Sequence, residues 1–345
     1  MTFELIKTLC ECGGIPGREA PVRDKLKELL SDFKCETDAL GNLLVTVCEP
    51  RKGGISLLFE AHLDRIGLMV GEVGDDGFVR VVKSGGIDRN CIMGTQIEIA
   101  AKDGMITGAV GAPFPYPAKP HNSAPASEYK LPEIDELFVD TGLSDAKSVI
   151  KPGMACYIKA EALKLLDGRV SAPGLDDRAG CAALVLAAVE VKEQATDNGV
   201  KLLFSSREET GGQGAKTGAF DSRADMAVAV DVGFAISPDV KAKDGVIMGK
   251  GPEIDSSSVL DERLTDALIS AAKSGGIPYQ ELVLPARATG TDADDLTVVA
   301  SGMRTALLSI PVRFMHHPSE TADLADIENT AKLLARFARE VNTDV

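Results

Sequence analysis

The stretch FEAHLDRIGLMV, residues 59–70, places a histidine and an aspartate at the end of an apolar run. The segment ISLLFEA, residues 55–61, has the nearly continuous apolar character of a buried strand in a parallel sheet. His62 and Asp64 therefore fall where this strand should end. Because ligands bind at the carboxyl ends of strands in open α/β sheets, the pair indicates a functional site.

Similar apolar runs alternate with helical patterns along most of the chain. Strands are predicted at LLVTV (43–47), VKLLFSS (200–206), DMAVAVDV (225–232) and TALLSIP (305–311). Helical spacing of apolar residues predicts helices at 18–33, 177–194, 261–276 and 326–341. This alternation predicts an α/β fold, with a mixed central sheet covered by helices on both faces.

Residues 67–162 break the alternation. Glycines separate short strand-like runs there, such as GFVRVVKSGG (77–86) and GMACYIKAEAL (153–163). We expect a small β-rich domain at 67–162, inserted into a catalytic domain formed by 1–66 and 163–345. Its proline- and alanine-rich segment, residues 111–136, is expected to be a long surface loop.

Composition restricts the partners and the compartment. The formal net charge of −15 disfavours binding to nucleic acid or to an anionic membrane surface. No apolar run reaches the roughly 18 to 20 residues that span a bilayer, and the first residues lack a signal-peptide pattern. Seven cysteines without a C-x-x-C pair are typical of reduced thiols. We expect a cytoplasmic protein.

Chemically versatile side chains follow several of the predicted strands. If the strands share one sheet, their polar ends converge at one edge, together with acids that open a helix after a glycine turn. The candidates are His62, Glu208, Glu209, Asp231 and His316, with Asp176 and Asp177 at the helix start.

Two imidazoles with several carboxylates and no thiolate suit divalent metals such as zinc or cobalt. Two metal ions per subunit, sharing one carboxylate, would lower the pKa of a bridging water toward neutrality and polarise a carbonyl. Glu208, as the spare carboxylate beside Glu209, would be the general base. Asp64 would accept the second N–H of His62 and fix its tautomer.

Taken together, the motifs resemble those of a known family. In order, they are AHLDRIG (61–67), LDDRAG (175–180), SREETGGQGA (206–215), AVDVG (229–233), TGTDADD (289–295) and PVRFMHHPSE (311–320). This set resembles the M42 family of metallo-aminopeptidases, which includes glutamyl, leucyl and lysyl aminopeptidases and proteins labelled endoglucanases. The resemblance implies a fold like that of zinc aminopeptidases and phosphorylase-hydrolases, with an inserted β-barrel domain used for dimerisation and oligomerisation.

The resemblance also implies roles for individual residues. His62 would bind one metal and His316 the other, with Asp176 bridging them. Glu209 and Asp231 would complete the two ligand sets, and the peptide between Asp176 and Asp177 would be cis. The resemblance further implies a homo-oligomer built from dimers, up to a tetrahedral particle of twelve subunits.

Four other residues have less defined roles. Asp292 is expected either to shape the substrate pocket or to cap the helix that follows it. His317 is expected to pack beside the site as a neighbour of His316. Arg65 and Arg207 stand where the family commonly has glutamate and a neutral residue, respectively, and they leave the preferred N-terminal residue open.

The predicted function is a dinuclear metal-dependent aminopeptidase that removes N-terminal residues from peptides through a metal-bridging hydroxide. A deacylase or deblocking enzyme that acts on N-acylated substrates could use the same metals, and a requirement for a free amine distinguishes the two. A glycoside hydrolase would need two carboxylates and no metal, which the histidines disfavour. A non-catalytic metal-storage protein would have no use for an unligated base at Glu208.

Overall fold

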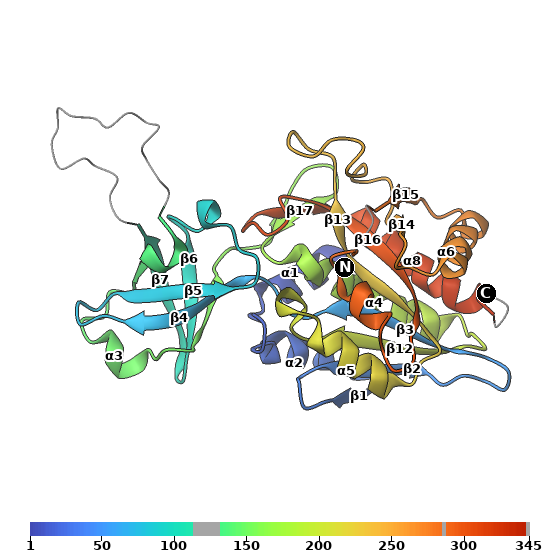
Figure 1. The fold of residues 1–345 in the computed structure, drawn as a ribbon, viewed down its shortest axis with the longest axis horizontal. Coiled ribbons are helices and arrows are strands. Elements are labelled where there is room, and N and C mark those ends of the chain that lie inside the picture. Colours follow the sequence, from blue (N-terminus) through green and yellow to red (C-terminus); the bar gives the residue numbers. More distant parts are fainter. Residues whose placement is uncertain (113–131, 285–287, 343–345) are drawn as a thin grey trace. The chain divides into compact units, whose positions relative to one another are not determined.

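The computed structural model describes residues 1–112, 132–284 and 288–342. Its internal contacts divide the chain into two compact units (Figure 1). The larger unit comprises Met1–Arg65, Glu161–Met315 and Ser319–Val345, and the smaller unit comprises Ile66–Ala160 together with His316–Pro318. The smaller unit thus interrupts the larger one in the sequence.

The larger unit is built on an eleven-stranded sheet. Nine of its strands follow the order β1-β2-β12-β3-β13-β16-β17-β11-β10, while β14 pairs with β16 and β15 pairs with β14. The four central strands β12, β3, β13 and β16 are parallel, whereas β1, β2, β17, β11 and β10 pair antiparallel with their neighbours. The strand bounds are β1 (Lys34–Thr37), β2 (Leu43–Cys48), β3 (Ser56–His62), β10 (Leu163–Lys164), β11 (Arg169–Ala172), β12 (Gly199–Ser205), β13 (Met226–Phe234), β14 (Glu253–Ser256), β15 (Gln280–Val283), β16 (Arg304–Arg313) and β17 (Glu320–Asp323).

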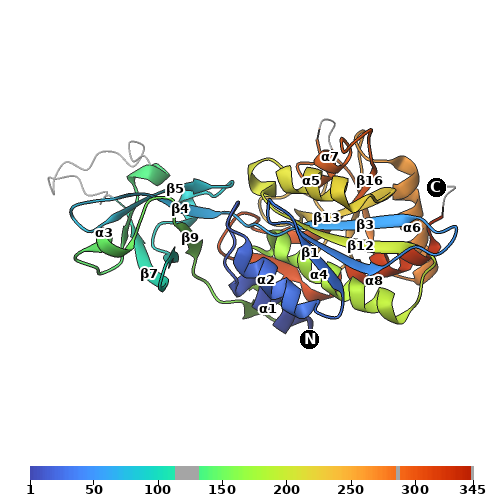
Figure 2. The same cartoon turned by 90° about the horizontal axis from the view of Figure 1, so that it is seen from below.

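Helices cover both faces of this sheet, as Figure 2 shows. Side chains of β3 point alternately to the two faces of the sheet. Leu57 and Phe59 pack in the core formed with α1, α2, α4, α6 and α8. Leu58 packs in the core on the other face, formed with α5 and α7. The helices are α1 (Thr2–Glu11), α2 (Ala20–Leu29), α4 (Leu175–Glu193), α5 (Gln213–Ser222), α6 (Glu262–Gly275), α7 (Asp292–Leu296) and α8 (Leu324–Glu340), with the 3₁₀ turn η4 (Glu208–Thr210). A strand buried on both faces needs apolar side chains in both directions, which explains the continuous apolar runs. The mixed sheet with helices on both faces confirms the predicted fold class.

The short strands were not predicted. β10, β11 and β17 extend the sheet through antiparallel pairing, but each contains only two to four residues. Runs this short carry too little periodicity to be separated from loops. Their pairing depends on the neighbouring strand.

The smaller unit is a closed antiparallel barrel with the order β4-β5-β8-β7-β6-β9. Its interior is aliphatic, with residues such as Val79, Ile99 and Leu137 fully buried. The elements are β4 (Gly67–Val73), β5 (Val79–Ser84), η1 (Arg89–Cys91), β6 (Gln96–Ala101), β7 (Gly104–Gly111), η3 (Ile134–Glu136), β8 (Phe138–Asp140), α3 (Ala146–Val149) and β9 (Ala155–Ile158). The barrel confirms the predicted β-rich insertion. Of the predicted loop at 111–136, residues 113–131 lie outside the described residues.

Two predictions from composition can be compared with the structure. All seven cysteines are free. Within the described ranges, no helix is both long enough and apolar enough to cross a membrane.

Candidate metal centre

The sheet of the larger unit brings His62 and Asp231 to the same level. In the parallel pair β3–β13, Ala229 lies opposite Glu60, so the same register places Asp231 beside His62 two residues later. β3 ends at His62, whereas β13 continues to Phe234. Asp231 is therefore inside a strand and not at its end, but it lies next to the place where the neighbouring strand stops.

The hydrogen bonds of His62 fix which of its nitrogens can bind a metal. Nδ1 lies 3.0 Å from the backbone oxygen of Asp64, and because a carbonyl only accepts, Nδ1 carries the proton. Nε2 lies 3.0 Å from Oδ1 of Asp176 and 3.8 Å from Oδ1 of Asp231. Nε2 is thus the nitrogen that faces the carboxylates.

The role predicted for the Asp64 carboxylate needs correction. Its Oδ1 lies 3.7 Å from His62 Nδ1, too far for a hydrogen bond, and the backbone oxygen of Asp64 orients the ring instead. The carboxylate accepts the backbone N–H of Glu208 at Oδ1 and that of Glu209 at Oδ2, both at 3.0 Å. Asp64 is fully buried, so these charge-assisted bonds hold the turn that carries both glutamates.

Four candidate ligands gather in the larger unit. One ligand atom from each of the buried residues His62, Asp176 and Asp231 lies within 4.8 Å of the others. A carboxylate oxygen of Glu209 lies within 4.8 Å of one of Asp176. Asp176 is close to both His62 and Glu209, which is the position that a shared carboxylate requires. The Asp176–Asp177 peptide is cis, as the resemblance implies.

The electrostatics of this group favour bound cations. Burial by itself lowers the pKa of His62, but the hydrogen bond with Asp176 and the nearby carboxylates of Asp231 and Glu208 raise it well above its usual value. Burial raises the pKa of Asp231, and burial together with Asp231 and other carboxylates raises the pKa of Glu208 to about 9. Three acidic side chains acting on one imidazole leave an excess of negative charge in a buried place.

A second observation agrees with a cation site. Among the described residues, Oδ2 of Asp177 and Oδ1 of Asp292 are buried without a hydrogen-bond partner. Imidazole nitrogen and carboxylate oxygen are ligands for zinc, cobalt and manganese. The donor set and the unbalanced charge therefore fit divalent metals.

Asp292 belongs to a buried acid pair behind the site. Oγ of Ser205 lies 2.7 Å from Oε1 of Glu60 and 2.6 Å from Oδ2 of Asp292. Because a hydroxyl donates only one hydrogen, a carboxyl proton must complete the second contact. Burial raises the pKa of Glu60 well above its usual value and that of Asp292 to about 7, so the pair holds a proton. The helix cap is Thr291, whose side chain accepts the N–H of Ala293, so capping by Asp292 was the wrong alternative.

Glu60 and Ser205 were missed in the sequence. An acid inside the apolar run LLFEA was the available signal for Glu60. A glutamate in a strand buried on both faces needs a polar partner. Ser205 ends β12 and gave no signal of its own, because serine is common at strand ends.

Arg65 and Arg207, which differ from the residues common in the family, both interact with the N-terminal segment. Arg65 is buried, and its Nη1 donates to the backbone oxygens of Cys10 at 3.3 Å and Pro173 at 3.2 Å. Arg65 therefore ties backbone segments together. Burial raises the pKa of Glu19, and the positive charge of Arg207 offsets a small part of this rise.

His316 and His317 are grouped with the smaller unit by their contacts. His316 has a left-handed backbone with φ of +64°, in the turn that follows β16. Its role as a metal ligand stays a prediction.

Comparison with known proteins now identifies the family. The profile described as M42 glutamyl aminopeptidase matches residues 41–333. The lysyl aminopeptidase of Pyrococcus furiosus is 32% identical over 349 residues, covering 98% of this chain and 97% of that protein. This chain belongs to the M42 family and is a metallo-aminopeptidase.

Solved structures agree with that assignment. An aminopeptidase from the archaeon Desulfurococcus kamchatkensis superposes with a TM-score of 0.90 at 30% identity, covering 99% of this chain and 96% of that one. The TET1 peptidase of Pyrococcus horikoshii, which can assemble into a tetrahedron or a large octahedral shell, has a TM-score of 0.84 at 30% identity, covering 99% and 100%.

Proposed function

We propose that the chain removes N-terminal residues from peptides at a dinuclear metal centre in which Glu208 is the general base. The buried group of His62, Asp176 and Asp231 carries the proposal, because these side chains leave negative charge that divalent cations would balance. Asp176 would be the shared ligand, since it lies close to Glu209 as well. His316 would complete the second ligand set, as its place in the sequence motif implies.

Two bound cations would lower the pKa of a shared water toward neutrality and polarise the scissile carbonyl. The residues around them supply orientation and proton transfer. His62 presents Nε2 because its Nδ1–H is held by the Asp64 carbonyl. Asp64, as a positioning residue, fixes the backbone of Glu208 and Glu209 through its carboxylate.

Glu208 is suited to move the proton. Its side chain is half-buried, at a turn directly after β12, so it can reach both the site and a substrate. Two divalent cations nearby would reverse the rise in its pKa and keep it as a carboxylate at neutral pH. Its carboxylate would take a proton from the attacking water and deliver it to the leaving amine nitrogen.

The proposal extends to assembly and compartment. A homo-oligomer built from dimers, up to a tetrahedral dodecamer, is supported by the assembly of the TET1 homologue. Subunit contacts through the barrel follow from the family resemblance. A cytoplasmic location is supported by the seven free thiols.

The test is hydrolysis of a panel of aminoacyl-p-nitroanilides, free and N-acetylated. The protein would be loaded with zinc or cobalt and compared with EDTA-stripped protein and with Glu208→Gln. We expect metal-dependent release from free-amine substrates, and a decrease in kcat of about 10² to 10⁴-fold in Glu208→Gln, the usual contribution of a general base. Lysyl, glutamyl and leucyl substrates in the panel rank the preferred N-terminal residue.

Glu193→Gln, at an exposed position at the end of α4, is the matched control and should leave kcat unchanged. Metal content measured on each variant separates loss of the base from loss of the metals. Hydrolysis of N-acetylated substrates alone would assign a deacylase instead. Hydrolysis that survives complete metal removal would refute the proposal.

A further inference from the structure

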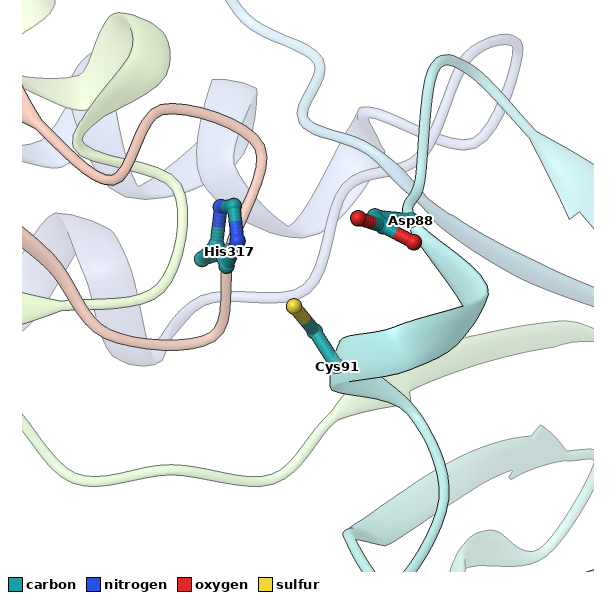
Figure 3. Close-up of side chains that lie close together, drawn as sticks. All are labelled: Asp88, Cys91 and His317. Atoms are coloured by element: carbon teal, nitrogen blue, oxygen red, sulfur yellow. The ribbon is translucent and has the colours of Figure 1, made fainter. Parts of the chain in front are cut away.

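A second group of metal-binding side chains lies in the smaller unit. One ligand atom from each of Asp88, Cys91 and His317 lies within 4.8 Å of the others, and all three residues are half-buried. Figure 3 shows Asp88 and Cys91 on one short turn, with His317 facing them from a separate segment. None of the three belongs to the ligand set of the peptidase centre.

The turn that carries Asp88 and Cys91 sets their directions. η1 runs from Arg89 to Cys91, and Asp88 is its N-cap. Side chains three residues apart eclipse each other in a 3₁₀ helix, so Asp88 and Cys91 project from the same side of the turn. Oδ1 of Asp88 accepts the backbone N–H of Asn90 at 2.9 Å and the Asn90 side-chain amide at 2.8 Å. Both bonds use Oδ1, so Oδ2 can bind a metal without breaking the cap.

The donor set is selective. Sulfur and imidazole nitrogen suit zinc or cobalt, whereas calcium and magnesium prefer oxygen ligands only. Tetrahedral zinc with bonds of about 2.0 to 2.3 Å separates its ligand atoms by roughly 3.3 to 3.8 Å. Ligand atoms that already lie within 4.8 Å need only small side-chain rotations to reach this geometry.

We propose that Asp88, Cys91 and His317 form a mononuclear zinc-type site, separate from the peptidase centre, with water as a fourth ligand. The metal would fasten the His316–Pro318 segment to the η1 turn. Because His317 adjoins His316, the site would also steady the segment that carries the proposed ligand of the peptidase centre.

A reactive thiol is a weaker explanation of the same cluster. Partial burial and the Asp88 carboxylate raise the pKa of the Cys91 thiol. A nucleophilic or redox-active cysteine needs the opposite environment, with nearby positive charge that favours the thiolate. A carboxylate beside a thiol instead provides two ligands for a metal cation, whose positive charge would favour the thiolate.

The test is a cobalt(II) titration of the full-length protein followed by absorption spectroscopy. A cobalt–thiolate bond gives a charge-transfer band in the near ultraviolet, whereas the peptidase centre contains only imidazole and carboxylate ligands. We expect the band in the unmodified protein and its loss in Cys91→Ser. Cys35→Ser, which changes a half-buried cysteine outside the cluster, is the matched control and should keep the band.

Two further variants separate binding from misfolding. Asp88→Asn keeps an oxygen for the N-cap but removes a negative ligand, so it should weaken cobalt binding while the barrel stays folded. His317→Ser should weaken binding without changing η1. A titration without a thiolate band, or a band that persists in Cys91→Ser, would overturn the site. The peptidase proposal fails separately, through loss of metal dependence in hydrolysis, because that assay does not detect the thiolate band.

Discussion

The barrel and the strand-end region of the large sheet bury different kinds of side chain. Within the described part of the smaller unit, no charged side chain is buried, and the interior consists of residues such as Val81, Ile97 and Leu137. The larger unit buries His62, Asp64, Asp176 and many other ionisable groups. The barrel interior is therefore stabilised by apolar packing, whereas the peptidase site depends on paired charges, so cations bound at the peptidase centre should stabilise only the larger unit.

The largest expected effect is the loss of barrel stability that follows when a cavity is created in its core. Leu137→Ala removes a fully buried side chain and should lower the free energy of unfolding of the barrel by roughly 2 to 5 kcal/mol. Hydrogen exchange in β5 and β8 should speed up, while exchange in β13 stays the same. Val82→Ala, at an exposed position of β5, is the control and should change little. Equally faster exchange in β13 would show that the two units unfold together, contrary to their separate cores.

Metal bound at the peptidase centre should stabilise the larger unit, which the Leu137→Ala cavity in the barrel should leave unchanged. Zinc at about a hundredfold excess over its Kd should stabilise the larger unit by about 2.7 kcal/mol for each ion bound. The experiment uses the Cys91→Ser background, so that only the peptidase centre contributes. Hydrogen exchange should slow in β3 and β13. Similar slowing in β4 and β5 would contradict a charge imbalance confined to the large sheet.

A smaller effect on kcat is expected when Asp64 no longer holds the backbone of Glu208 and Glu209 through its carboxylate charge. Asp64→Asn keeps the shape of the side chain but removes the charge that accepts the N–H groups of Glu208 and Glu209. We expect kcat to fall by about 10- to 100-fold, the usual cost of losing such a supporting group. KM and metal content should change much less. Loss of metal in proportion to kcat would instead make Asp64 a support for the ligands.

Counted per released proton, the smallest expected effect is the pH dependence of metal binding. The raised pKa values of His62 and Glu208 mean that both hold protons at neutral pH before metal binds. Metal must displace these protons, so affinity should rise with pH by about tenfold per pH unit for each proton released. Calorimetry in buffers with different ionisation enthalpies counts the protons. A constant affinity across neutral pH would show that the site is already deprotonated.

Most long strands and helices of the larger unit could be predicted, because burial of a strand on two faces requires a continuous run of apolar residues. Continuous apolar runs marked β3, β12, β13 and β16, and helical spacing marked the long helices that cover them. The two- to four-residue strands β10, β11 and β17 had no such run. In the smaller unit the β-rich character was readable, but closure of the barrel depends on the pairing of β4 with β9.

The same distinction holds for the site. Residue order alone indicates which chemical groups stand at strand ends and helix starts, because an apolar run that stops at His62 marks the edge of a buried strand. Only the tertiary structure decided what the Asp64 carboxylate binds, since its partner Glu208 is 144 residues away. It likewise joined Ser205 to Glu60 and Cys91 to His317. Periodicity records whether a side chain is buried, whereas contacts between distant segments are set by how the elements pack.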